Sequence, residues 1–214
     1  EIRRQKKALL KALERNRMAL VCHLPTFVST ADLTESLREA SIQETIQSLR
    51  VAAGLHPLKI VLHPSFIQGL GAAMIERARP YVMQALERVL EEADRLSALV
   101  CVENLFPRSL SLFRPEDFDI VFEKFPAATL TLDTGHAHIG DQGEERATAF
   151  IRRFSGRIGH IHASDNSGRD DEHLPIGVGT VDYTKIVTAL KGIGYDGTIT
   201  LEVFSRDRDY LKIS

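Results

Sequence analysis

The sequence predicts an α/β protein in which a parallel sheet is covered by helices. Short apolar runs typical of strands alternate along the chain with longer segments of helical periodicity. Most of these runs are continuously apolar, which indicates strands buried on both faces, as parallel strands are. No low-complexity segment or Ser/Gly-rich linker interrupts the alternation, so a single domain over residues 1–214 is expected.

The predicted elements follow one another in a regular order. The strands are MALVCHL (18–24), LKIVLHP (58–64), LVCVENL (99–105), TLTLDT (129–134), IGHIHAS (158–164) and TITLEVF (198–204). The helices are predicted over residues 33–53, 71–97 with a bend at Pro80, 116–123, 144–154 and 183–193, the last ending at Gly194. A basic amphipathic helix opens the chain at Glu1 without a preceding Met, so we expect further sequence upstream.

Composition narrows the class of protein. The 214 residues are 43% hydrophobic and 26% charged, which suits a globular domain with a sizeable core. The formal charge of -2 provides no general attraction for nucleic acid, so that partner is less favoured. Cys22 and Cys101 lie in apolar runs without metal-ligand spacing, and buried reduced thiols make a cytoplasmic protein the default expectation. No apolar run approaches the roughly 20 residues of a membrane span, so no membrane partner is expected.

Two architectures fit this alternation, and the distribution of polar residues distinguishes them. A doubly wound sheet should carry a Gly-rich phosphate fingerprint at an early strand-to-helix turn, and no GxGxxG occurs. The segment GVGTVD (177–182) is a weak look-alike, because it does not directly follow a strand. A barrel instead collects functional residues at the C-terminal ends of many strands.

Every predicted strand ends in a side chain that can bind a metal ion. Carboxylates and imidazoles are costly to place against apolar strands unless they are paired or bind metal, and convergence at one rim of a barrel provides that pairing. The strand-end residues are His23, His63, Glu103, Asp133 with His136, His162 and Glu202, and the loop after the fifth strand adds Asp171 and His173. Oxygen and nitrogen ligands without thiolate suit Mn, Zn, Co, Fe or Mg and do not select among them.

Several of these residues also have a structural interpretation. A functional role is most strongly indicated for Glu103 and Glu202, because Glu inside an apolar run is rarely buried without a partner. A capping role fits His23 equally well. His63 precedes Pro64, so a loop-shaping role competes with a functional one.

Other polar residues near the strand ends are expected to be structural. His160 lies one layer below His162 on the same side of its strand, where core packing or support of His162 is expected. His138 is predicted to be a loop residue, and Asp165 in SDNSGRDD a solvated turn residue. Arg169 in the same loop is a candidate for holding an anionic group of a substrate.

Six segments in this order resemble the xylose isomerase-like barrels, a family that includes sugar and sugar-phosphate isomerases and epimerases as well as endonuclease IV. The segments are VLHPS, VENL, LDTGH, HIHASDNSG, DEHLPIGVG and LEVF. The resemblance implies a (β/α)8 TIM barrel with divalent metal at its rim. Because six strands are predicted, it places the first two strands upstream of Glu1, since an unclosed barrel would leave parallel edges exposed.

The family contains two chemistries, and this sequence has residues for both. In the isomerases, one divalent ion is held by residues that correspond to Glu103, Asp133, His162 and Glu202. The resemblance then implies that the two glutamates remove and return a proton through an enediolate, while His136 orients or polarises the substrate. Further substrate contacts are then expected from His23, His63 and Arg169.

In endonuclease IV-like enzymes, additional ligands form a multinuclear zinc site for phosphodiester hydrolysis. By the resemblance they correspond to His23, His63, His136, Asp171 and His173. A hydrolase of DNA or of a small phosphodiester is therefore the alternative function.

The isomerase or epimerase interpretation is preferred. The loop SDNSGRDDEHLPIGVG has Ser167 and Gly168 where the endonucleases are expected to have a lysine. The segment LPTFVSTADL after His23 contains no Arg, Lys or Tyr to hold a nucleic acid. The expected partner is a small sugar or sugar phosphate, and a homo-oligomer is left open. A third interpretation, a barrel that binds sugar or metal without catalysis, is disfavoured because the acid pair is intact.

Overall fold

The computed structural model describes residues 2–67, 69–141 and 143–204. The chain divides into two compact units, Glu1–Val102 and Glu103–Ser214. The boundary falls at the end of strand β3 (Val100–Glu103), so the last residue of this strand belongs to the second unit. Glu1, with which the predicted N-terminal helix opens, lies outside the described residues.

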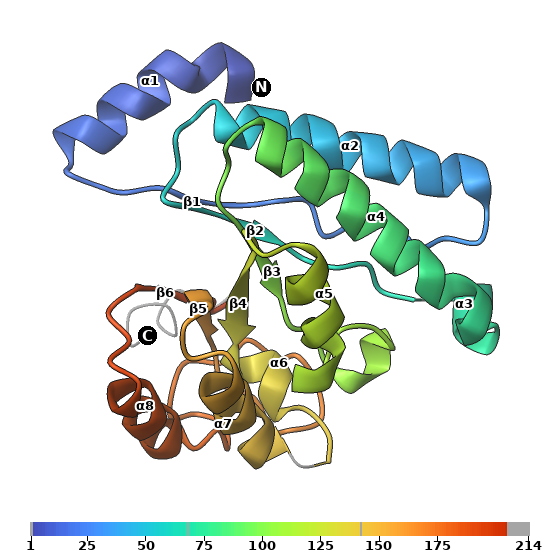
Figure 1. The fold of residues 1–214 in the computed structure, drawn as a ribbon. Helices are drawn as coiled ribbons and strands as arrows, with labels where there is room; N and C mark the ends of the chain where they lie inside the picture. Colours follow the sequence, from blue (N-terminus) through green and yellow to red (C-terminus); the bar gives the residue numbers. More distant parts are fainter. Residues whose placement is uncertain (1, 68, 142, 205–214) are drawn as a thin grey trace. The chain divides into compact units, whose positions relative to one another are not determined.

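The first unit alternates helices with short parallel strands (Figure 1). Its elements are α1 (Ile2–Arg15), β1 (Val21–His23), α2 (Glu35–Ala53), β2 (Lys59–Leu62), α3 (Leu70–Ala73), α4 (Ile75–Arg95) and β3. Strand β2 pairs in parallel with both of its neighbours, with Cys22 opposite Ile60 and Val61 opposite Cys101. Parallel pairing with intervening helices is the predicted pattern.

Helices α2 and α4 run side by side in Figure 1 and share the apolar core of the first unit. Their buried side chains include Ile46 and Leu49 of α2 and Val82 and Leu86 of α4. Apolar residues three or four positions apart form the buried stripe of each helix, so core packing explains why these segments are helical. Ion pairs join the two helices at their margin: Arg88 with Glu39 and Arg50 with Glu92, each at 2.7 Å.

The second unit continues the alternation. Its elements are η1 (Pro107–Ser109), η2 (Pro115–Phe118), α5 (Asp119–Lys124), β4 (Thr129–Asp133), α6 (Thr134–His138), α7 (Gly143–Arg153), β5 (Ile158–Ala163), α8 (Tyr183–Gly192) and β6 (Thr198–Leu201). Strand β5 pairs in parallel with β4 and β6. This register places Asp133 opposite His162 at the C-terminal ends of β4 and β5.

Four phenylalanines form the aromatic core beside these strands. Phe118 of η2 lies 5.5 Å from Phe150 of α7, and Phe122 of α5 lies 5.1 Å from Phe154, both pairs edge to face. Such pairs stabilise a core beyond their buried area. The contacts of these rings pack η2, α5 and the C-terminal end of α7 against one another.

The structure agrees with the predicted order of elements and differs in their bounds. Each predicted strand is present but shorter. The helix predicted over 71–97 is interrupted at Met74, whose φ of -126° and ψ of 46° are not helical, and Pro80 lies inside α4. The short helix α6 was not predicted. The single domain and the two further strands upstream of Glu1 stay predictions.

Among the described residues, every helix is too short or too polar to cross a membrane.

Candidate metal centre

Four residues predicted as ligands converge at the C-terminal edge of the strands in the second unit. Their metal-binding atoms all lie within 4.8 Å of one another. They are Glu103 at the end of β3, Asp133 at the end of β4, His162 next to the end of β5, and Glu202 directly after β6. This tetrad is assembled because parallel strands present their C-terminal ends at one edge.

The imidazole of His162 is the centre of the tetrad. Its Nδ1 lies 3.0 Å from Glu103 Oε1, 3.1 Å from Glu202 Oε2 and 3.7 Å from Asp133 Oδ2. Glu103 and His162 are buried, and the Glu202 side chain is 19% exposed. Three carboxylates therefore share one nitrogen in a space with little water.

The donor set fits a divalent cation. Among the described residues, Oδ2 of the buried Asp133 has no hydrogen-bond partner, although its Oδ1 accepts from the His136 N–H at 2.6 Å. An unsatisfied buried carboxylate oxygen is costly unless a cation or donor meets it. Three carboxylates and one imidazole suit Mn, Zn, Co, Fe or Mg.

Charge coupling within the tetrad shifts two pKa values. Burial lowers the pKa of His162, but its hydrogen bonds to Glu103 and Glu202 outweigh burial and raise the pKa to about 11. Burial raises the pKa of Asp133 to about 6. In the metal-free tetrad, the His162 proton therefore supplies the positive charge that the carboxylates require.

A second cluster joins His136 of α6 to the loop between β5 and α8. Asp171 Oδ2 lies 3.3 Å from His136 Nε2 and 3.0 Å from His173 Nε2. Burial raises the pKa of Asp171, yet the hydrogen bonds from both histidines hold it well below its usual range. For His136, burial lowers the pKa, but Asp133 and Asp171 raise it to about 10. The structure thus brings together His136, Asp171 and His173.

The rings of this cluster are oriented by backbone carbonyls. His136 Nδ1 lies 2.9 Å from Asn104 O, and His173 Nδ1 lies 2.9 Å from Glu202 O. A carbonyl only accepts, so each Nδ1 carries the hydrogen. A histidine held in this way turns Nε2 toward a ligand, which is the arrangement that metal-binding histidines commonly have.

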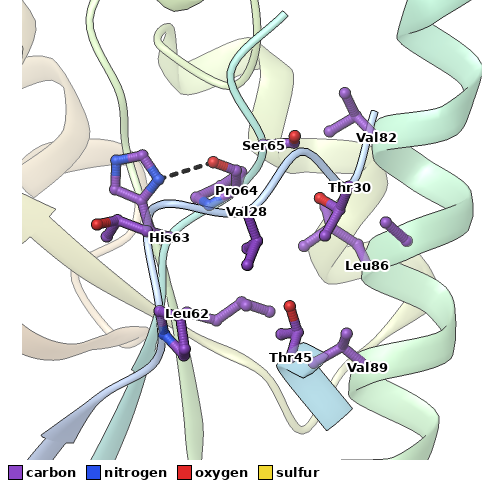
Figure 2. A pocket seen from close by; sticks show the side chains of 13 residues that line it. Val28, Thr30, Thr45, Leu62, His63, Pro64, Ser65, Val82, Leu86 and Val89 are labelled. Carbon is purple, nitrogen blue, oxygen red and sulfur yellow. Dashed lines mark hydrogen bonds between the residues drawn. The ribbon is translucent and has the colours of Figure 1, made fainter. Parts of the chain in front are cut away.

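The two candidate histidines of the first unit show the same orientation. His23 Nδ1 donates to Leu24 O at 2.7 Å, and His63 Nδ1 donates to Pro64 O at 2.8 Å. Figure 2 shows His63 turned toward the Pro64 carbonyl and away from Leu86 and the other α4 side chains. The two rings lie 6.4 Å apart between centroids. Both residues thus combine a position at or next to the end of a strand with a defined tautomer.

The cavity beneath His63 is part of the core. It is bordered by side chains that include Val82, Leu86 and Val89 of α4 (Figure 2), and its volume is about 10 Å³. That volume holds at most one water molecule. The cavity is therefore a packing gap and not a substrate site.

Asp165 organises the loop that carries Asp171 and His173, and the expectation of a solvated turn residue was wrong for it. Its side chain is fully buried. Oδ1 accepts from the N–H groups of Asn166 and Val181 at 2.9 and 3.0 Å, and Oδ2 accepts from Gly177 at 2.8 Å. A Cβ at Gly179 would lie 2.3 Å from Asp165 Oδ1, so the close approach requires glycine. The two glycines of GVGTVD thus allow this part of the loop to pack against the Asp165 carboxylate.

Of the other polar residues considered from the sequence, His160 and His138 are buried and Arg169 is exposed. Both ring nitrogens of His160 bond to β6, Nδ1 to Thr198 at 2.7 Å and Nε2 to Thr200 at 3.0 Å. Burial, with the charge of His162, lowers the His160 pKa to about 4, so the ring is neutral. His138, predicted in a loop, is buried in α6. Arg169 is exposed in the loop after β5.

Comparison with known proteins identifies the family. Residues 1–213 match the family described as "Xylose isomerase-like TIM barrel". The chain belongs to this family. Its parallel strands with intervening helices are therefore those of the TIM-barrel fold.

Relatives of this TIM-barrel chain include sugar epimerases. A solved structure called a D-tagatose 3-epimerase-like protein is 27% identical, with a TM-score of 0.84 over 98% of this chain and 79% of that one. An L-ribulose 3-epimerase of Methylomonas sp. (strain DH-1) is 33% identical over 82 residues, 38% of this chain and 26% of the relative. An uncharacterized protein of Methanocaldococcus jannaschii is 28% identical over 92% of this chain and 68% of its own length.

Replacement of Asp165 by Asn should destabilise the protein by about 2 to 3 kcal/mol, because an amide nitrogen must then face a backbone N–H in a buried site. Equilibrium urea unfolding measures the change. Asp170→Asn in the same loop is the control: Asp170 is exposed and pairs only with Arg108 among the described contacts, so a change within about 0.5 kcal/mol is expected. Equal stability of the two variants would contradict the organising role of Asp165.

Proposed function

We propose that this protein is a divalent-metal-dependent isomerase or epimerase of a small sugar or sugar phosphate. The observation that carries the proposal is the meeting of Glu103 and Glu202, from opposite ends of the second unit's sequence, at Nδ1 of His162. The epimerase relatives support the reaction class. The tetrad of Glu103, Asp133, His162 and Glu202 would hold the ion.

The bound ion would neutralise the carboxylates and polarise a substrate carbonyl. One glutamate then takes the proton from the carbon next to the carbonyl, and the C–H electron pair moves to form an enediolate. The other glutamate returns a proton to the same carbon from the opposite face, which inverts it. Burial raises the pKa of Glu202 and the His162 hydrogen bond lowers it, with a net decrease, so this carboxylate is ionised at neutral pH and can accept a proton.

The remaining rim residues are assigned to substrate binding. His136 would orient or polarise the substrate, since its Nε2 is held toward Asp171 by the Asn104 carbonyl on the other side of the ring. His23 and His63 would contact the substrate through Nε2, and the exposed Arg169 would hold an anionic group such as a phosphate.

Glu103→Gln and Glu202→Gln should each reduce turnover by at least about 100-fold, because Gln cannot take the proton. The measurement is deuterium uptake from D2O into carbon-bound positions of a panel of ketoses and ketose phosphates. Glu172→Gln is the matched control, since Glu172 is exposed and, among the described residues, hydrogen-bonds to Ser167 of its own loop. Undiminished exchange in both active-site variants would show that the glutamates do not transfer the proton.

Metal binding should release about one proton per ion at pH 8. The His162 pKa of about 11 means that the free tetrad holds this proton, and ligation requires its loss. As the pH falls through about 6, Asp133 also becomes protonated, so more protons are released and the affinity falls. Calorimetric titration in buffers of different ionisation enthalpy counts the protons.

The control for this titration is His138→Gln, because His138 is buried against Thr180 and lies outside the tetrad. Its proton count should equal that of the unaltered protein. Metal binding without proton release at pH 8 would contradict the assignment of His162 as a ligand.

A second candidate function is phosphodiester hydrolysis at a multinuclear metal site. The observation that favours it is the cluster of His136, Asp171 and His173, in which the buried Oδ1 of Asp171 has no hydrogen-bond partner among the described residues. The Nδ1 bonds of His23 and His63 provide the tautomer that further ligands would need.

Elemental analysis of the full-length, metal-replete protein separates the two functions. The isomerase predicts about one ion per chain, whereas the hydrolase needs two or three. If Asp171 binds metal, Asp171→Asn should remove one ion while the tetrad retains its own. Asp170→Asn, an exposed neighbour, controls for the substitution. A count of one ion that Asp171→Asn leaves unchanged would eliminate the multinuclear site.

A further inference from the structure

We infer that Asn104 is a positioning residue for the metal site, holding the ligands Glu103 and Asp133 and the ring of His136 in register. The inference rests on the proposed metal site. Asn104 directly follows Glu103 in the sequence and is fully buried, with 0% of its surface exposed. The sequence alone does not mark Asn104 as functional, because an amide is neither acid, base nor strong metal ligand.

The side-chain amide of Asn104 binds both backbone groups of Asp133. Asn104 Oδ1 accepts from Asp133 N–H at 2.8 Å, and Nδ2 donates to Asp133 O at 3.0 Å. The amide NH2 faces a backbone carbonyl and the amide oxygen faces a backbone N–H, both of Asp133, so the orientation of the amide is unambiguous. An Asp, which only accepts when ionised, or a Leu cannot make this pair.

The backbone of Asn104 adds two further contacts. Its N–H donates to Thr131 O at 3.3 Å, and its C=O accepts from His136 Nδ1 at 2.9 Å. Asn104 therefore bonds to three successive points: the strand residue two before Asp133, Asp133 itself and the histidine three residues after it.

These contacts restrict the freedom of the ligands. Glu103 is covalently joined to Asn104, so fixing Asn104 against Asp133 also fixes the separation of the two ligand backbones. The Asp133 side chain has one oxygen committed to His136 N–H, which leaves Oδ2 as the ligand atom. A displaced Asp133 backbone would move that oxygen away from His162 and Glu103. Residues that orient metal ligands in this way commonly change metal affinity by about 10- to 100-fold when replaced.

The test compares Mn²⁺ affinity in the full-length protein, measured from the electron paramagnetic resonance signal of free Mn²⁺. Asn104→Leu keeps the number and branching of the side-chain heavy atoms, in a bulkier side chain, and removes both amide hydrogen bonds. We expect Mn²⁺ binding to weaken by about 10- to 100-fold. Asn104→Ser, which is smaller and admits water, is the second variant if Asn104→Leu does not fold, and the same direction is expected.

The matched control is Ser109→Ala. Ser109 is also fully buried in the segment after β3, and its hydroxyl bonds to the backbone of Phe106 and Ser111 but to none of the ligands. Urea unfolding in the presence of a chelator measures the loss of stability in each variant. A purely structural Asn104 predicts reduced stability with unchanged Mn²⁺ affinity of the folded protein, as for Ser109→Ala.

The outcomes distinguish this inference from the proposed function. Weaker Mn²⁺ binding in the Asn104 variants, with normal binding in Ser109→Ala, supports the positioning role. Normal binding in a folded Asn104 variant overturns it and leaves the metal site intact. If the unaltered protein binds neither Mn²⁺ nor Zn²⁺, the proposed metal site fails and the inference is overturned with it.

Discussion

The repulsion among three carboxylates that share one imidazole is the constraint on which the candidate site depends. Glu103, Asp133 and Glu202 surround His162 Nδ1 where little water can screen them. Buried charges of one sign are stable only when a positive charge compensates them. Although burial lowers the pKa of His162, hydrogen bonds to Glu103 and Glu202 raise it, so a proton on this ring would supply the charge in the absence of a cation. A divalent cation would provide more charge and would also meet the unsatisfied Asp133 oxygen.

Buried amides and carboxylates around the tetrad hold the loop backbone that such a site requires. Loops at strand ends have backbone groups without ladder partners, and these groups need side chains when they are buried. Asn104 serves both backbone groups of Asp133, while Asp165 serves three N–H groups of its loop. His160 ties β5 to the threonines of β6 below His162. The four residues of the tetrad thus lie beside buried, hydrogen-bonded polar side chains.

The two candidate chemistries share this framework and diverge at the rim. His136 contacts Asp171 on one side and the Asn104 carbonyl on the other, so its position suits either a substrate oxygen or a second cation at Nε2. The proposed sugar isomerase or epimerase would use the first of these arrangements. The Asp171 carboxylate, which bonds to two histidines, has no role in the proposed isomerase mechanism and would be a ligand in a multinuclear site.

Local pattern was sufficient for the order of elements and for the placement of acids and histidines at strand ends, and the structure brings four of these residues together. The reason is geometric: parallel strands end at one edge, so an acid or histidine at the end of each apolar run must approach its neighbours. Side-chain partners that come from distant residues could not be predicted in this way. Asp165 was predicted to be a solvated turn residue because its hydrogen-bond donors lie up to 16 positions away in the sequence. Asn104 was not predicted to matter because its amide is neither an acid nor a base. Helix α6 begins where the Asp133 carboxylate accepts from His136 N–H, and this cap depends on where β4 ends. The placement of acids and histidines at the strand ends therefore follows from sequence, whereas the buried polar partners that orient these side chains are decided by tertiary packing.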